Sequence, residues 1–173
     1  FRQPTAASGA PAVPTTSGTA ASATADKDLL GAAEMGDHDA LMKALKDGAK
    51  LDAVDEKTHT ALHWAAKCGR ADDIEALTAA GAPLNPKTKT GVTPLIYAAS
   101  EGWDDCVQLL LAAGADPTIQ TAKGRTAREA TSMKMAKADD ESKPRFAKVL
   151  QLLHAAASGG GLFGAAPAPA AAA

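Results

Sequence analysis

The stretch TALHWAAKCGR at residues 60–70 returns one period later, as TPLIYAASEGW at residues 93–103. Four series of marker residues share a spacing of 33 positions along the chain. The series are Gly36, Gly69 and Gly102; Gly48, Gly81 and Gly114; Thr60, Thr93 and Thr126; and Gly91 with Gly124. A common period of this length indicates an array of structural units that stack on one another.

Each unit is predicted to form a helix, a turn, a second helix and a loop. Thr93 followed by Pro94 is typical of a helix start, and Gly69 in the preceding unit ends its first helix where a positive φ is needed. Paired acids such as Asp72 and Asp73 begin the second helix, where they cap it and favour its dipole. About a dozen residues rich in Pro, Asn, Thr and Gly then turn as a hairpin-like finger.

The unit resembles an ankyrin repeat, whose pattern is G-x-T-P-L-H-x-A-A, then a Leu-rich helix, then G-A-D. The resemblance rests on Thr60-Ala61-Leu62-His63, Gly81-Ala82, Gly91, Thr93-Pro94-Leu95 and Gly114-Ala115-Asp116. It implies an all-α solenoid of stacked helix-turn-helix units with finger loops. We expect an ankyrin repeat domain at residues 26–157, with repeats at about 26–55, 56–88, 89–121 and 122–157.

The two outer repeats depart from the family pattern. Repeat one lacks the Thr-Pro start, and repeat four carries Arg128 where the family has Leu. In repeat four the stretch QLLHAA begins at Gln151, about ten residues later than the period places it. We therefore expect an insertion near residues 134–144, in the form of an extended loop.

The resemblance implies that His63 makes structural hydrogen bonds between repeats. The equivalent residue of the next repeat is Ile96, so no shared chemistry depends on a histidine there. Trp64 and Tyr97 share another equivalent position, at which we expect packing.

Composition narrows the function classes. Of the 173 residues, 46% are hydrophobic, 22% charged and 3% aromatic, and the formal net charge is −2. No apolar run is long enough for a transmembrane helix. The two cysteines are too few for a disulfide scaffold, so we expect reduced thiols. Nucleotide-binding, hydrolase and zinc-protease motifs are absent. We therefore expect no enzyme activity, no cofactor and no metal.

The two ends differ from the repeats in composition. Residues 1–25 contain no acidic residue, and residues 158–173 contain no charged residue. Neither segment can build a core, so each should be disordered unless a partner orders it. The first residue is Phe1, which suggests a processed product or a fragment. An acid-free, Ser/Thr/Ala-rich leader resembles an organelle transit segment, for a plastid before a mitochondrion. Otherwise we expect a cytoplasmic or nuclear protein.

The resemblance also implies protein binding through the finger tips and the exposed face of each first helix. The candidate partner-binding residues are Lys57, His59, Lys67, Lys87, Lys89, Val92, Glu101, Trp103, Lys123 and Arg125. Trp103 leaves two alternatives open: a half-exposed interface anchor, or a shield over the helix ends.

Charge favours an acidic partner surface. Residues 122–148 carry eight basic and four acidic residues, a net +4, which leaves −6 for the rest of the chain. We expect no nucleic-acid binding, because no aromatic residues are interleaved with the basic ones.

The sequence thus favours an interaction subunit of a larger organellar complex, such as a photosynthetic or respiratory assembly, with the two ends as additional clamps. A membrane complex can host such a subunit. The alternative is a soluble regulatory adaptor or chaperone-like protein that binds a client transiently.

Overall fold

The computed structural model describes residues 20–158, and this part of the chain contains eight α-helices and no strand. The helices are α1 (Ala20–Met35), α2 (His38–Lys46), α3 (Ala61–Cys68), α4 (Ala71–Ala79), α5 (Pro94–Glu101), α6 (Asp104–Ala113), α7 (Ala127–Met135) and α8 (Lys143–Ala157). The expectations about the ends of the chain lie outside the described residues, apart from the point at which α1 begins.

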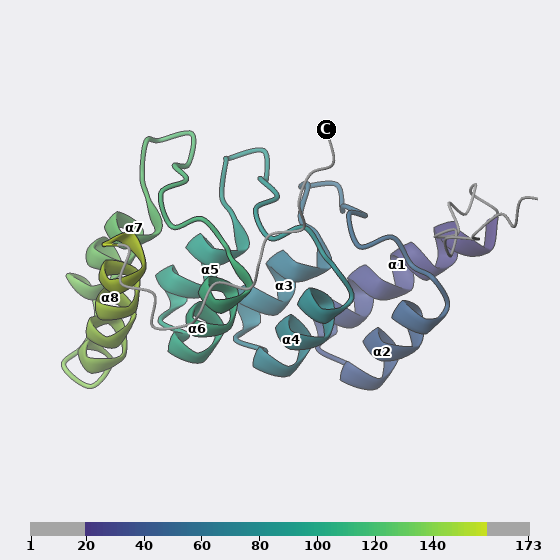
Figure 1. The fold of residues 1–173 in the computed structure, drawn as a ribbon, viewed down its shortest axis with the longest axis horizontal. Helices are drawn as coiled ribbons and strands as arrows, with labels where there is room; N and C mark the ends of the chain where they lie inside the picture. Colours follow the sequence, from purple (N-terminus) through teal and green to yellow (C-terminus); the bar gives the residue numbers. More distant parts are fainter. Residues whose placement is uncertain (1–19, 159–173) are drawn as a thin grey trace, which may run out of the picture.

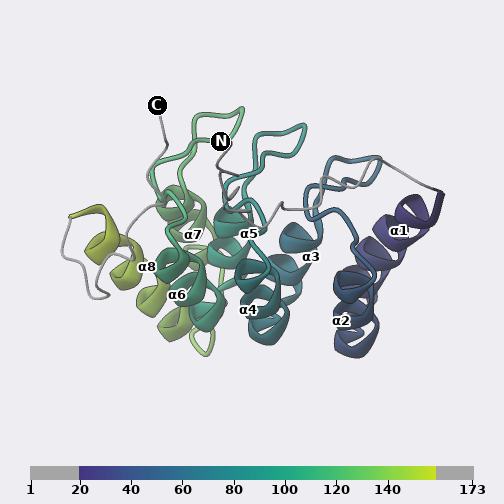
Figure 2. The ribbon, with the colours of Figure 1, turned by 45° about the vertical axis from the view of Figure 1, so that its right-hand side comes forward.

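The helices form two rows, as the sequence predicts for an all-α solenoid. The odd-numbered helices pack on one another in order, and so do the even-numbered ones (Figure 1). Three finger loops project on the same side of this stack, as both views show (Figures 1 and 2). We refer to them as finger one (47–60), finger two (80–93) and finger three (114–126).

Helix boundaries follow the local signals in each repeat. Thr93 accepts a hydrogen bond from the Ile96 N–H at the start of α5, and Pro94 occupies the first turn. Gly69 ends α3 with a φ of 74°, which an L side chain rarely adopts. Asp72 and Asp73 lie in the first turn of α4 as predicted, but they do not cap it, because its N-cap residue is Arg70.

The core is aliphatic and runs the length of the stack. Small residues on the first helices, such as Ala65 and Ala98, are completely buried and let neighbouring helices approach closely. The largest fully buried apolar side chains are Leu29, Leu41, Leu62, Ile74, Leu77, Leu95, Leu110, Leu153, Val107 and Val149. Each such side chain stabilises the fold by about 1.5–3 kcal/mol relative to an exposed position.

Repeat four corrects the expectation of an extended loop. Its second helix, α8, begins at Lys143, well before Gln151, and only a short turn at 136–142 separates it from α7. The insertion therefore lies mainly in this turn and partly in the first turn of α8, which has 15 residues where α6 has 10 (Figure 1). At the other end, α1 begins at Ala20, inside the segment expected to be a low-complexity extension.

Candidate protein-binding surface

The three fingers share one backbone design. In each, an N–H donates to the carbonyl oxygen four residues later: Asp55 to His59, Thr88 to Val92, and Thr121 to Arg125, at 3.0, 3.0 and 2.9 Å. The residue before each acceptor has a positive φ, and this residue is Thr58, Gly91 or Gly124. The fingers are therefore equivalent tight turns that present short tips of the same shape.

Neighbouring fingers are tied to each other. The Lys89 Nζ atom of finger two donates to the Glu56 carbonyl oxygen of finger one, at 2.7 Å. The Ala122 N–H of finger three donates to the Thr90 carbonyl oxygen of finger two, at 2.9 Å. The finger tips thus form one continuous surface rather than three independent loops.

The structure places five predicted cations together on this surface. All five side chains are exposed, and they are Lys57, Lys87, Lys89, Lys123 and Arg125. None of them forms an ion pair with a residue in 20–158, and Lys89 alone donates a side-chain hydrogen bond within that range. The positive charge of the finger tips is therefore available to a partner.

His59 is not exposed, which corrects its assignment to the binding surface. Its side chain is buried, with Nδ1 at 3.1 Å from Asp55 Oδ2 and Nε2 at 3.0 Å from Tyr97 Oη. Trp64 and His63 pack against the same ring. His59 therefore ties finger one to α5, and a partner cannot contact it without disturbing this network.

Val92 contributes to the fold through its backbone, and its side chain is partly covered. It is half-buried against the core, and its carbonyl oxygen accepts from Thr88 N at 3.0 Å and His63 Nε2 at 3.1 Å. The first-helix residues are more accessible. Lys67 is exposed, with its Nζ 4.6 Å from the centre of the Trp64 ring. Glu101 is half-exposed and pairs with Lys134 at 3.4 Å.

The bond from His63 confirms the role that the resemblance implied. Nδ1 of this buried histidine accepts the Thr60 N–H at 3.0 Å, so Nε2 carries the proton that is donated to Val92 in the next repeat. Burial lowers the pKa of His63 from 6.5 to about 4. The ring is therefore neutral at physiological pH, as a structural donor and acceptor requires.

Trp103 acts as a shield, the second of the two alternatives. Its ring lies against Gly69, where an added Cβ would stand 2.5 Å from the ring, and its Nε1 donates to the Lys67 carbonyl oxygen at 3.2 Å. Arg145 covers the ring, with its Cζ 5.1 Å from the ring centre. The half-buried Trp103 thus closes the end of α3 from the following repeat.

The same covering recurs along the array. Arg70 lies over Gly36 and donates to its carbonyl oxygen at 2.8 Å, while Phe146 lies against Gly102. Arg145, the neighbour of Phe146, donates to the Glu101 carbonyl oxygen at 3.2 Å. Because the last carbonyls of a helix lack partners within it, each following repeat supplies a cap. Phe146 and Trp103 therefore occupy equivalent positions in their repeats. The insertion in repeat four, of about ten residues, consequently lies before Phe146.

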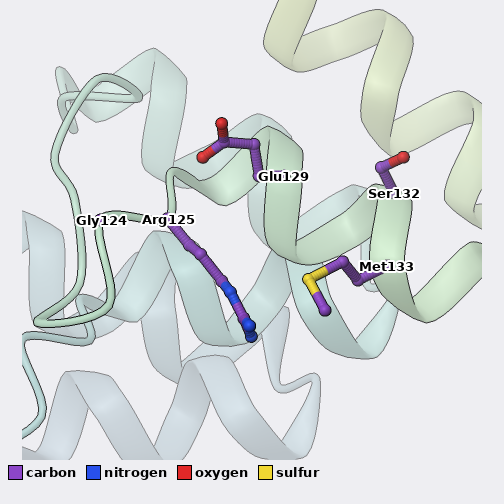
Figure 3. A pocket seen from close by; sticks show the side chains of 5 residues that line it. All are labelled: Gly124, Arg125, Glu129, Ser132 and Met133. Atoms are coloured by element: carbon purple, nitrogen blue, oxygen red, sulfur yellow. The ribbon is translucent and has the colours of Figure 1, made fainter.

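A shallow cavity of about 350 Å³, wide open to solvent and lined by exposed residues, lies at the repeat-four end of the array beside finger three. It is lined by Gly124, Arg125, Glu129, Ser132 and Met133, which we call the end cavity (Figure 3). The Arg125 side chain and the Glu129 carboxylate point in opposite directions in this view. Of these residues, only Arg125 was predicted from the sequence to bind a partner. A signal for the others was present, since Glu129 and Ser132 are polar where repeat three has Ile96 and Ala99.

Within residues 20–158, no three His, Cys, Asp or Glu side chains are grouped so that they could hold a metal ion. No helix in this range is long and apolar enough to cross a membrane. Cys68 is exposed and Cys106 is buried, and both are free thiols.

Stacked helix pairs with fingers on one side define a repeat solenoid, a class of protein that presents an extended binding surface. A family model for ankyrin repeats, in three copies, matches residues 29–121. The chain therefore belongs to the ankyrin repeat family, whose domains are protein–protein interaction modules. The match ends within finger three, although α7 and α8 continue the stack. A comparison with curated proteins found no match.

Proposed function

We propose that this chain is a non-enzymatic interaction subunit that binds an acidic protein surface through its finger tips. The observation that carries the proposal is the row of exposed finger cations without ion pairs in the described residues, on loops that hydrogen bonds tie together. A preorganised row of like charges favours a partner of opposite charge, because little conformational entropy is lost on binding.

We further propose that the host is a larger organellar assembly, photosynthetic or respiratory, in a plastid before a mitochondrion. The acid-free composition of residues 1–25 supports the organelle, and the uncharged residues 158–173 support a role of both ends as clamps on a partner. No cofactor and no nucleic acid are required for this role.

The second candidate is a regulatory adaptor that binds a client transiently. One observation favours it: among the described residues, the exposed large hydrophobic side chains are Met35, Val54 and Met133, which lie on different elements. Permanent interfaces are usually more apolar than this surface, whereas transient ones are polar and depend on salt.

Affinity purification of the full chain from its source, followed by mass spectrometry and size-exclusion chromatography, tests both candidates. The informative variant replaces four finger cations with glutamine: Lys57, Lys87, Lys123 and Arg125. A matched control replaces four exposed lysines on other elements: Lys27, Lys43, Lys46 and Lys137.

The subunit proposal predicts stoichiometric recovery in one large complex, which the finger variant loses and the control keeps. Sub-stoichiometric, salt-sensitive partners that the finger variant loses would instead establish the adaptor. Recovery that is unchanged in the finger variant would overturn binding through the finger tips.

A further inference from the structure

The free end of repeat four is polar where the internal repeats are apolar. In repeat three, Leu95, Ile96 and Ala99 are buried, with at most 4% exposure, beneath the elements that follow. The equivalent side chains of repeat four, Arg128, Glu129 and Ser132, are all exposed. This face is therefore not built to take a further apolar repeat.

Finger two shows how the backbone of a neighbouring segment can cover such a position. The backbone of finger three lies along it, with the Ala122 N–H donating to the Thr90 carbonyl oxygen. The approach is so close that a Cβ on Gly91 would stand 2.7 Å from the Ala122 nitrogen. An extended backbone can thus dock on the edge of a finger when a glycine stands there.

Finger three has the same backbone edge as finger two, but no segment of residues 20–158 lies against it. Gly124 has a φ of 69°, as Gly91 has 74°, but a Cβ built on Gly124 would meet nothing described within 4 Å. The Lys123 carbonyl oxygen corresponds to that of Thr90 and receives no hydrogen bond from the described residues. The end cavity lies directly beside this edge (Figure 3).

The charges around the end cavity are mainly positive. Lys123, Arg125 and Arg128 are exposed and form no ion pair within the described part of the chain. Arg128 lies one turn before Ser132 on α7. The single acid, Glu129, is already engaged, since its Oε2 accepts the Thr126 N–H at 2.8 Å in the capping box of α7.

We propose that the end cavity binds an extended acidic segment of a partner protein. Its backbone runs along the edge of finger three as finger three runs along finger two, and one of its N–H groups donates to the Lys123 carbonyl oxygen. Its carboxylates pair with Arg125 and Arg128, and a small apolar side chain rests on Met133. This inference rests on the proposed function and assigns it a site.

Two other occupants are available for this site: residues 159–173 of the chain itself and a second copy of the chain. Charge favours the acidic segment over both. Residues 159–173 of the chain itself contain no acidic side chain to pair with the arginines. A second copy carries its paired acids on helices, and its extended segments are fingers whose tips are basic at Lys87, Lys89 and Lys123. Both remain outcomes of the test.

The test uses the full, isotope-labelled chain and a blocked hexapeptide of alternating Val and Asp, titrated in amide-resolved NMR. We expect signal changes confined to residues 122–133. A peptide with Lys in place of Asp should not bind, and N-methylation of alternate residues of the acidic peptide should abolish binding, because it removes backbone donors.

Two pairs of variants test the Arg125 contact and the space beside Ser132 separately. Arg125→Gln should weaken peptide binding about fivefold or more, and Lys46→Gln, at an exposed lysine of α2 outside the fingers, less than about twofold. Ser132→Trp should fill the end cavity and block the peptide, whereas Gln151→Trp, at an exposed position of α8, should not. Circular dichroism of each variant checks that it is folded.

Four results would overturn the inference. These are equal binding of the acidic and basic peptides, signal changes outside residues 122–133, tighter binding after deletion of residues 159–173, or self-association that shifts the same signals without peptide. The last two would identify the chain's own tail or a second copy as occupant. Partner capture that requires the finger cations but tolerates Ser132→Trp would overturn the end cavity alone and leave the proposed function in place.

Discussion

At the scale of single residues, Thr58 adopts a left-handed backbone conformation. The equivalent residue of each of the other two fingers is a glycine. The φ of Thr58 is 62°, against 74° at Gly91 and 69° at Gly124. A left-handed conformation costs an L residue about 1–2 kcal/mol, and a β-branched side chain tolerates it poorly. Finger one therefore carries local strain that fingers two and three avoid.

We predict that Thr58→Gly stabilises the protein by about 1 kcal/mol, because the strain released exceeds the entropy that glycine adds to the unfolded chain. Urea unfolding followed by circular dichroism measures the change. Thr58→Ala is the control, since it removes the branch and the hydroxyl but keeps the Cβ. A gain from Thr58→Ala as large as that from Thr58→Gly would show that the backbone is not the cause.

His63 makes the stability depend on pH in a definite direction. Burial lowers its pKa from 6.5 to about 4, so the unfolded chain takes up the proton more readily than the folded chain. The stability that the neutral ring contributes is complete above pH 6.5 and is lost as the pH falls from 6.5 through 4. The loss amounts to about 3 kcal/mol at most, at roughly 1.4 kcal/mol per pKa unit.

His63→Gln should flatten this part of the profile, because Gln at the third helical position can still accept the Thr60 N–H without titrating. Unfolding free energies between pH 4 and 7 for the two proteins provide the measurement. His38 is a control of opposite sign: its hydrogen bond to Asp73 raises its pKa, so its contribution is lost only as the pH rises above 6.5. Equal slopes for wild type and His63→Gln between pH 4 and 6.5 would contradict the assignment.

At the scale of helices, the cap that Trp103 places on α3 joins two repeats. We predict that Trp103→Ala costs about 2 kcal/mol, since it removes a half-buried ring, and that Trp103→Phe costs about 1 kcal/mol or less, since it loses the Nε1 bond and part of the ring but keeps a six-membered aromatic ring there. Urea unfolding of both variants measures the difference. Equal losses would assign the stabilisation to the hydrogen bond and not to the ring.

The elements that sequence predicts are those whose signals are local. Thr93, Pro94, Gly69 and Gly114 mark the ends of α3, α5 and α6 because capping and positive φ depend on neighbouring residues. The start of α8 was missed, although Phe146, Val149 and Leu153 share a helical face and are buried. That spacing was a signal for a longer helix, but the offset of QLLHAA from the period obscured it.

The candidate site depends on contacts that sequence spacing does not contain. His59 lies in a polar loop, and its burial requires Tyr97, 38 residues away, to meet it. The sequence allows Trp103 to be either an interface anchor or a shield, because it does not show that the ring lies against Gly69. The finger cations, by contrast, were predicted correctly as exposed, because they stand at turn tips where no other element can cover them.

Over the whole molecule, the identity of three side chains decides where stacking stops. We predict that Arg128→Leu, Glu129→Ile and Ser132→Ala together make the protein self-associate, because they recreate the apolar face that repeat three buries. Ile is compatible with the helix start, as Ile96 shows after Thr93. Sedimentation velocity over a range of concentrations detects the dimer.

The matched control places the same three side chains at positions that are exposed in each of the first three repeats, as Lys46→Leu, Asp47→Ile and Asp52→Ala. It should remain monomeric under the same conditions. A control that associates as strongly as the end variant would mean that added hydrophobicity, and not the shape of the repeat face, drives assembly.

The caps on the first helices all point the same way along the chain. Arg70, Trp103 and Arg145 each close a helix that was synthesised before them. Since a ribosome releases the N-terminus first, every first helix emerges with its last carbonyls open to water and is closed only when the following repeat appears. A product truncated from the C-terminus therefore always ends in an open helix, whereas a fragment that begins at a later repeat keeps every cap it needs.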